Sequence, residues 1–128
     1  FILIANGPVQ VAQMIVSQQQ TSDFTGDPTL IVHPSINHLR NDYFILTPIG
    51  YVHNWTSVFR PKGLEIKHNG SILPAASFQP VGDGSWELAY VKVSPGQQRF
   101  ESEGKFGLSV YGYGPATAYG YPGGMILQ

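Results

Sequence analysis

Turn-forming residues divide this chain into short segments, and this division limits its fold more than any other feature. The 128 residues include 15 glycines and 10 prolines, and between them no convincing helix of three turns can be placed. Several segments alternate apolar and polar residues, which is the period of a β-strand. Short strands at such regular spacing are typical of sandwiches and barrels. We therefore predict an all-β chain without a long helix, folded as a single antiparallel β-sandwich, jelly-roll-like or immunoglobulin-like, of roughly nine or ten short strands.

Two segments predict strand pairing most clearly. Asn69-Gly70 is a strong hairpin signal, and it joins predicted strands at residues 64–68 and 71–73. Residues 98–102 lead through Glu103-Gly104-Lys105 into a strand that starts at residue 106. That strand is predicted to place one apolar face, from Phe106, Leu108 and Val110, opposite a second face, from Ser109, Tyr111 and Tyr113.

The ends and the connections of the chain carry further expectations. Residues 1–5 form an apolar run that we predict to be a strand, and residues 35–40 a loop or a single helical turn. Because the chain starts at Phe1 without an initiator Met or a basic leader, we expect a fragment of a longer protein. Its length favours one domain, residues 1–128.

Charge and cysteine content argue against several classes of function. The formal net charge of -1 and the pI near 6.4 give no electrostatic reason to bind nucleic acid. No apolar run approaches the ~18 residues of a membrane helix, so membrane insertion is not expected. The absence of cysteine rules out disulfides, thiolate metal sites and a cysteine nucleophile.

Catalytic and metal-binding chemistry also lacks support in the sequence. The four histidines do not have the spacing of a metal site, and the loop containing Asp23 and Asp27 lacks the dense acids of a calcium loop. There is no G-x-S-x-G elbow and no evident pair of buried acids. We therefore predict no enzyme activity, no metal and no cofactor.

Binding is the chemistry that the sequence favours, through polar loops and aromatic strands. The loops at residues 17–28 and 35–42 are natural places for function. Exposed Trp and Tyr rings would form a platform for sugar rings, with amide and imidazole groups donating hydrogen bonds, although such rings more often pack in the core. The candidate ligand-binding residues are Gln19, Asp23, Asp27, His38, Trp55, Tyr113 and Tyr121.

An ordered series of motifs gives the chain a family resemblance. The series consists of GDPTLIVHPSINHLRNDYFILTPIGYVHNWTSVF at residues 26–59, a hairpin, SPGQQRFES at 94–102 and FGLSVYGYGPATAYGYPGGM at 106–125. With its GDP motif, its strand ending in TP and its closing VYGY and YGYP, the chain resembles the C-terminal portion of the IgGFc-binding protein N-terminal domain family. The resemblance implies a non-catalytic, extracellular module of the kind found in mucus-type animal proteins and in surface or secreted bacterial proteins.

Three functional hypotheses follow. The first is an adhesion or recognition module, extracellular or on the cell surface, that binds a glycan or glycoprotein. The second is a structural tip or spacer of an oligomeric surface fibre, in which aromatic faces bury against neighbouring copies of a homo-oligomer such as a trimer. The third is a hydrolase of surface polymers, which the lack of a carboxylate pair disfavours.

Overall fold

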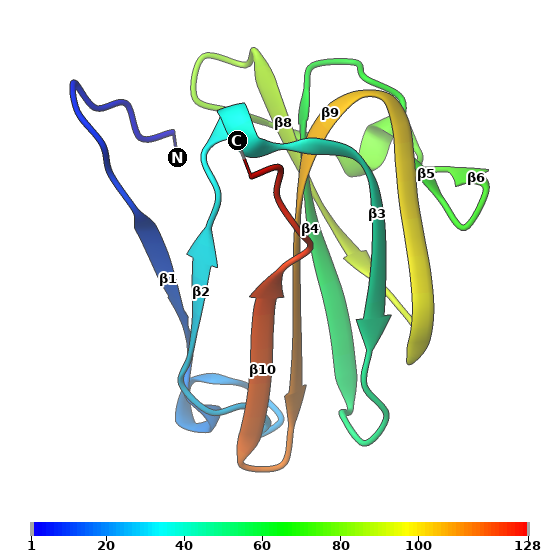
Figure 1. Ribbon diagram of the computed structural model, residues 1–128. Coiled ribbons are helices and arrows are strands. Elements are labelled where there is room, and N and C mark those ends of the chain that lie inside the picture. Colours follow the sequence, from blue (N-terminus) through cyan, green and yellow to red (C-terminus); the bar gives the residue numbers. More distant parts are fainter. Residues whose placement is uncertain (1, 128) are drawn as a thin grey trace.

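The computed structural model describes residues 2–127, which form strands joined by loops and single helical turns (Figure 1). Three short 3-10 helices are present, at Gln18–Gln20, Ile36–His38 and Ala75–Ser77. The ten strands are β1 (Val11–Ile15), β2 (Thr29–His33), β3 (Arg40–Thr47), β4 (His53–Pro61), β5 (Lys67–His68), β6 (Ser71–Ile72), β7 (Gln79–Val81), β8 (Trp86–Lys92), β9 (Gly96–Gly114) and β10 (Thr117–Pro122).

The strands form two facing sheets and a separate hairpin, and every pairing is antiparallel. One sheet has the order β7–β8–β4–β9–β10, and the other has the order β3–β9–β5–β6. The third unit is the hairpin of β1 and β2. The predicted all-β class and sandwich are confirmed.

Strand β9 belongs to both sheets because it bends midway along its 19 residues. Its first part pairs with β3 and β5, and its second part pairs with β4 and β10. Gly104 lies between Glu101 and Phe106, where the pairing with β3 shifts register, and a Cβ atom there would come 2.9 Å from the Leu64 side chain. The segments at 98–102 and 106–113 are therefore one continuous strand that joins the two layers (Figure 1).

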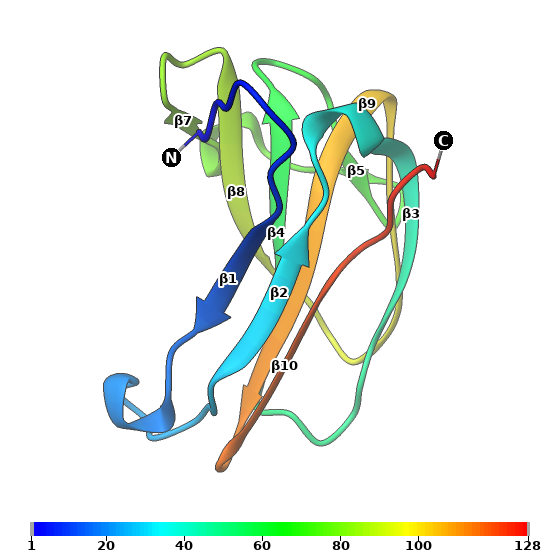
Figure 2. The same ribbon diagram turned by 60° about the vertical axis from the view of Figure 1, so that its left-hand side comes forward.

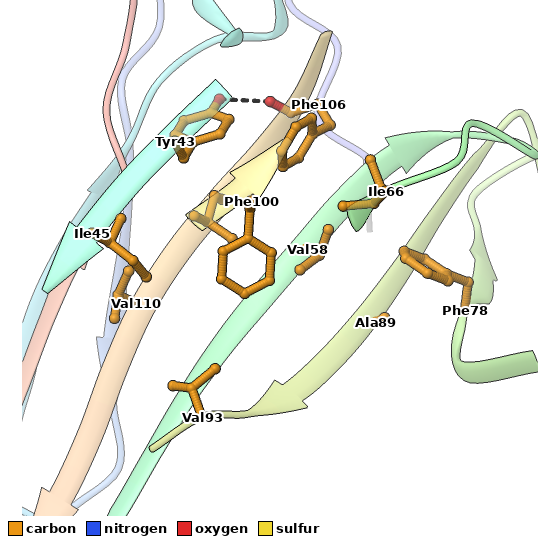
Figure 3. Packing of buried hydrophobic residues seen from close by; sticks show 11 residues of the cluster. Tyr43, Ile45, Val58, Ile66, Phe78, Ala89, Val93, Phe100, Phe106 and Val110 are labelled. Atoms are coloured by element: carbon orange, nitrogen blue, oxygen red, sulfur yellow. Dashed lines mark hydrogen bonds between the residues drawn. The ribbon is translucent and has the colours of Figure 1, made fainter. Parts of the chain in front are cut away.

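The core lies between the two sheets and has members from both (Figure 3). Tyr43 on β3 packs edge-on against Phe106 on β9, with ring centroids 4.9 Å apart. The Tyr43 hydroxyl donates to the Phe106 carbonyl oxygen at 2.6 Å and accepts from the Arg40 amide at 2.9 Å. The predicted apolar face of β9 is confirmed, because Phe106, Leu108 and Val110 are all buried.

Arg60 is a charged residue inside this core. Its side chain pairs with Glu87 at 2.8 Å, donates to the Leu64 carbonyl oxygen at 2.7 Å and lies over the ring of Phe78. Burial of a guanidinium is tolerated when its donors are satisfied in this way. The contacts hold the β4–β5 connection against β8.

Local predictions about turns were right at the hairpin and wrong at the N-terminus. β5 and β6 meet at Asn69-Gly70, where both residues have positive φ, +49° and +82°, as a two-residue type I′ turn requires. Residues 36–38 form the expected single turn. Residues 2–5 form no strand, although the apolar run predicted one, because no neighbouring strand pairs with them. Ile2 instead lies beside Gly82, and Ile4 is 90% exposed.

Candidate functional site

The outer face of the β4–β8–β9 region carries a group of aromatic and hydroxyl side chains. Alternate residues of β4 face the core, so the others face outward. Trp55 lies between Lys92 of β8 and Tyr111 of β9, and Ser57 lies between Tyr90 and Ser109. The predicted second face of β9, from Ser109, Tyr111 and Tyr113, belongs to this outer surface.

The β1–β2 hairpin lies over part of this face and creates a groove beside it. The hairpin packs through Ile15 and Ile31, which approach Gly120 of β10 so closely that a side chain there would collide with them. Figure 2 shows β1 and β2 in front of the sheet, with β2 next to β10. The groove has a volume of about 260 Å³ and is lined by Gln13, Met14, Ile15, Val16, Ile31, Ser57, Tyr90, Ser109, Tyr111 and Tyr113.

The lining is uncharged and amphipathic. It contains three tyrosines, two serines and one glutamine, with aliphatic side chains and Met14 on the hairpin side. Tyr90 is 61% exposed, so one ring is presented to solvent. Burial raises the pKa of Tyr111 to about 12, helped by the neighbouring Tyr90 and Tyr113, so its phenol stays neutral. The groove therefore offers ring surfaces and neutral hydrogen-bonding groups.

A chain of hydrogen bonds connects the hairpin to the floor of the groove. The Nε2 atom of His33 lies 3.0 Å from Oε1 of Gln13, and its Nδ1 atom lies 3.2 Å from Oγ of Ser109. Because an amide oxygen only accepts, Nε2 carries the proton and Nδ1 accepts from the serine hydroxyl. Burial lowers the pKa of His33, which favours this neutral form. In a catalytic triad the histidine contacts a carboxylate, but His33 contacts the amide of Gln13. The three side chains therefore position the hairpin and do not form such a triad.

Asp23 anchors the loop at residues 17–28 to the sheet. Its Oδ2 atom lies 2.6 Å from Nε2 of His53 on β4, and its Oδ1 atom accepts from the amide and the hydroxyl of Thr25. The hydrogen bond from His53, followed by that from the Thr25 hydroxyl, lowers the pKa of Asp23 to about 2. The carboxylate therefore stays ionised and holds the loop against β4.

Gly26 makes a second connection between the same loop and β9. Its amide donates to the Gly114 carbonyl oxygen at 2.8 Å, and its φ is +113°. A Cβ atom at this position would come 2.9 Å from the Tyr113 ring. The glycine of the GDP motif and the second tyrosine of VYGY thus pack directly against each other.

The structure brings some of the predicted site residues together and separates others. Asp23 contacts His53 and Tyr113 packs at Gly26, so both lie where the loop is held to the sheet, and Trp55 lies on the same outer face. Gln19 lines a separate shallow depression of about 320 Å³ beside the groove. The remaining three lie elsewhere: Asp27 in the exposed part of the loop, His38 in the second 3-10 helix, and Tyr121 on the core side of β10 with its hydroxyl donating to the Leu46 carbonyl oxygen.

Besides the aliphatic residues and Met14 of the hairpin side, the sequence prediction missed four polar or aromatic residues that line or support the groove: Gln13, His33, Ser57 and Tyr90. Tyr90 was detectable, because it alternates with buried Ala89 along a strand that was itself predicted. Ser57 shares the outward parity of Trp55. Gln13 and His33 join the site only through the position of the hairpin, for which the sequence carries no local pattern. Within residues 2–127, no three His, Asp or Glu side chains converge in a way that would hold a metal ion.

The sandwich and its lateral groove define an all-β binding module. A family model described as IgGFc binding protein matches residues 1–112, which is most of the chain, and the chain belongs to this family. The family resemblance is confirmed, although Tyr113 of VYGY and the whole YGYP segment lie beyond the matched residues. Membership indicates an extracellular module that binds a protein or glycoprotein partner. Searches among curated proteins and among solved structures gave no match to this chain.

One structural observation bears on membrane association. Within the part of the chain that the structure describes, no helix has the length and apolar character needed to span a bilayer.

Proposed function

We propose that this protein is an adhesion or recognition module, extracellular or on the cell surface, whose groove binds a glycan carried by a glycoprotein. The observation that carries the proposal is the groove lining, which combines three tyrosines with serine and glutamine side chains and has no charged member. Sugar rings have apolar faces that stack on aromatic rings and hydroxyl groups that require neutral donors and acceptors.

The size of the groove supports a short ligand segment. Binding sites for whole small molecules usually enclose ~300–1,000 Å³. At about 260 Å³ this groove is slightly smaller, and it is partly open to solvent. A terminal portion of a larger chain fits such a site, with the rest of the ligand extending across Trp55 on the same face.

The test is a glycan array probed with the wild-type chain and with Tyr90→Ala. A stacked ring contributes ~0.5–1.5 kcal/mol beyond its area, so we expect a roughly two- to tenfold loss of affinity for any glycan bound. Phe44→Ala is the matched control, because Phe44 is 66% exposed on the other sheet and Tyr90 is 61% exposed. The Fc fragment of IgG, which the family description names, belongs among the probes.

Two results would contradict the proposal. One is an array on which no glycan binds the wild-type chain. The other is a Tyr90→Ala variant that keeps full affinity while Phe44→Ala loses it. Circular dichroism of both variants checks that the sandwich is still folded.

A second candidate is a structural module of a surface fibre, assembled through sheet faces. Four large apolar residues in and after β3 are exposed, namely Phe44, Leu46, Ile49 and Val52. Exposed apolar side chains that gather into a patch mark an interaction site, and these four lie within nine residues of the sequence. Light scattering that shows a stable oligomer, lost on Phe44→Ala, together with an empty glycan array, would favour this function.

A further inference from the structure

One edge of β1 is unpaired. β1 pairs with β2 from Val11 opposite His33 to Ile15 opposite Thr29, and within residues 2–127 no other strand pairs with it. The strand lies at a lateral margin of the molecule (Figure 1). Backbone amide and carbonyl groups along such an edge are satisfied only by water or by another strand. The chemistry of this edge therefore specifies an extended polypeptide as its partner.

The strand lacks the features by which natural proteins block strand addition. Its sequence, VAQMI, contains no charged residue and no proline, and the pairing with β2 contains no bulge. Its outward face is apolar, because Met14 is 70% exposed and its neighbour Leu30 on β2 is 54% exposed. An edge of this kind is an association site.

We propose that β1 pairs antiparallel with β1 of a second copy of this chain, with Gln13 on the twofold axis. In this register Gln13 faces Gln13, Ala12 faces Met14, and Val11 faces Ile15 of the other copy. The isologous contact joins two hairpins into one four-stranded sheet. Met14 then lies opposite the small Ala12, the β-branched Val11 and Ile15 lie opposite each other, and the two Gln13 side chains face each other.

The neighbouring registers fit less well. A shift of two residues in either direction places the Gln13 amide opposite Ile15 or Val11, so a polar group meets an aliphatic side chain. A shift of one residue turns the hairpin faces to opposite sides of the joined sheet. Only the register centred on Gln13 matches amide with amide.

The experiment measures molar mass by light scattering for the wild-type chain, Gln13→Glu, Gln13→Lys and an equimolar mixture of the two variants. Residues directly opposite in a pair have Cβ atoms ~4.5–5.5 Å apart, where like charges repel and opposite charges attract. We expect twice 14.0 kDa for the wild type, 14.0 kDa for each variant alone, and the dimer mass again in the mixture.

Gln20→Glu and Gln20→Lys are matched controls, because Gln20 is exposed in the loop beyond β1 and lies outside the proposed contact. Both controls should remain dimeric. A wild-type chain that stays at 14.0 kDa overturns the proposal, as do variants that dimerise alone or a mixture that stays monomeric. Circular dichroism and the urea midpoint of each variant establish that the measured species are folded. The glycan array is an independent readout, so failure of this proposal leaves the proposed function standing.

Discussion

Substitution of Gly26 by alanine tests how the loop at residues 17–28 is held against the sheet. Two costs are expected. The φ of +113° is a conformation that alanine rarely adopts, which costs ~1–3 kcal/mol. The new Cβ atom would lie 2.9 Å from the Tyr113 ring, and overpacking of this kind costs a further ~1–3 kcal/mol. The two together predict a loss of roughly 2–6 kcal/mol in the free energy of unfolding.

Urea unfolding of four variants, Gly26→Ala, Gly50→Ala, Tyr113→Ala and the double variant of Gly26 and Tyr113, separates the two costs. Gly50 has a similar φ of +92°, and a Cβ atom added there would meet nothing within 4 Å, so Gly50→Ala reports the backbone cost alone. Gly26→Ala should exceed it by ~1–3 kcal/mol. The double variant, which also carries Tyr113→Ala, lacks the collision. Its loss of unfolding free energy should therefore be smaller than the sum of the two single-variant losses, by a similar ~1–3 kcal/mol. Equal losses for Gly26→Ala and Gly50→Ala, or strict additivity in the cycle, would refute the reasoning.

Two further predictions concern the core and the loop anchor. Tyr43→Phe removes a hydroxyl that serves both the Phe106 carbonyl and the Arg40 amide, so we expect ~1–3 kcal/mol of destabilisation by urea unfolding; an unchanged midpoint would contradict it. Carboxyl NMR should show that Asp23 titrates near 2, and that its pKa rises in His53→Ala. Folding lowers this pKa from an unfolded value of ~3.9. The ionised carboxylate therefore stabilises the protein in full at pH values above ~3.9, and this stabilisation is lost as the pH falls through about 2. A normal pKa for Asp23 in the wild type would contradict its role in holding the loop to β4.

The strands of the sandwich were predictable where local pattern and pairing agree. Asn69-Gly70 allows little but a tight hairpin, and the alternation from Phe106 to Val110 assigned the core face of β9. The run at residues 1–5 is as apolar as a strand, yet nothing pairs with it, and pairing is a tertiary property. The shared membership of β9 in two sheets also depends on partners distant in sequence.

The site was predictable only to the extent that a two-residue period defines a face. Trp55 and Tyr113 were expected on one surface and lie on one. Tyr121 was grouped with them, but its register opposite Val110 turns its ring to the core side, and a register between strands is not visible in either strand alone. The Asp23–His53 contact spans 30 residues and likewise has no local pattern.

The family motifs and the groove have different roles in this structure. Gly26 of the GDP motif and Tyr113 of VYGY pack on each other and fix the loop that follows β1, and therefore the hairpin that forms one wall of the groove. Tyr90 and Gln13, which supply the exposed ring and an amide of that groove, lie outside the quoted motifs. Other lining residues lie within the quoted motifs, namely Ile31, Ser57, Ser109, Tyr111 and Tyr113, so the motifs supply part of the lining and leave positions 13 and 90 outside them. We therefore expect chains that share these motifs to share the groove as a shape, and to differ in ligand through the residues at positions 13 and 90.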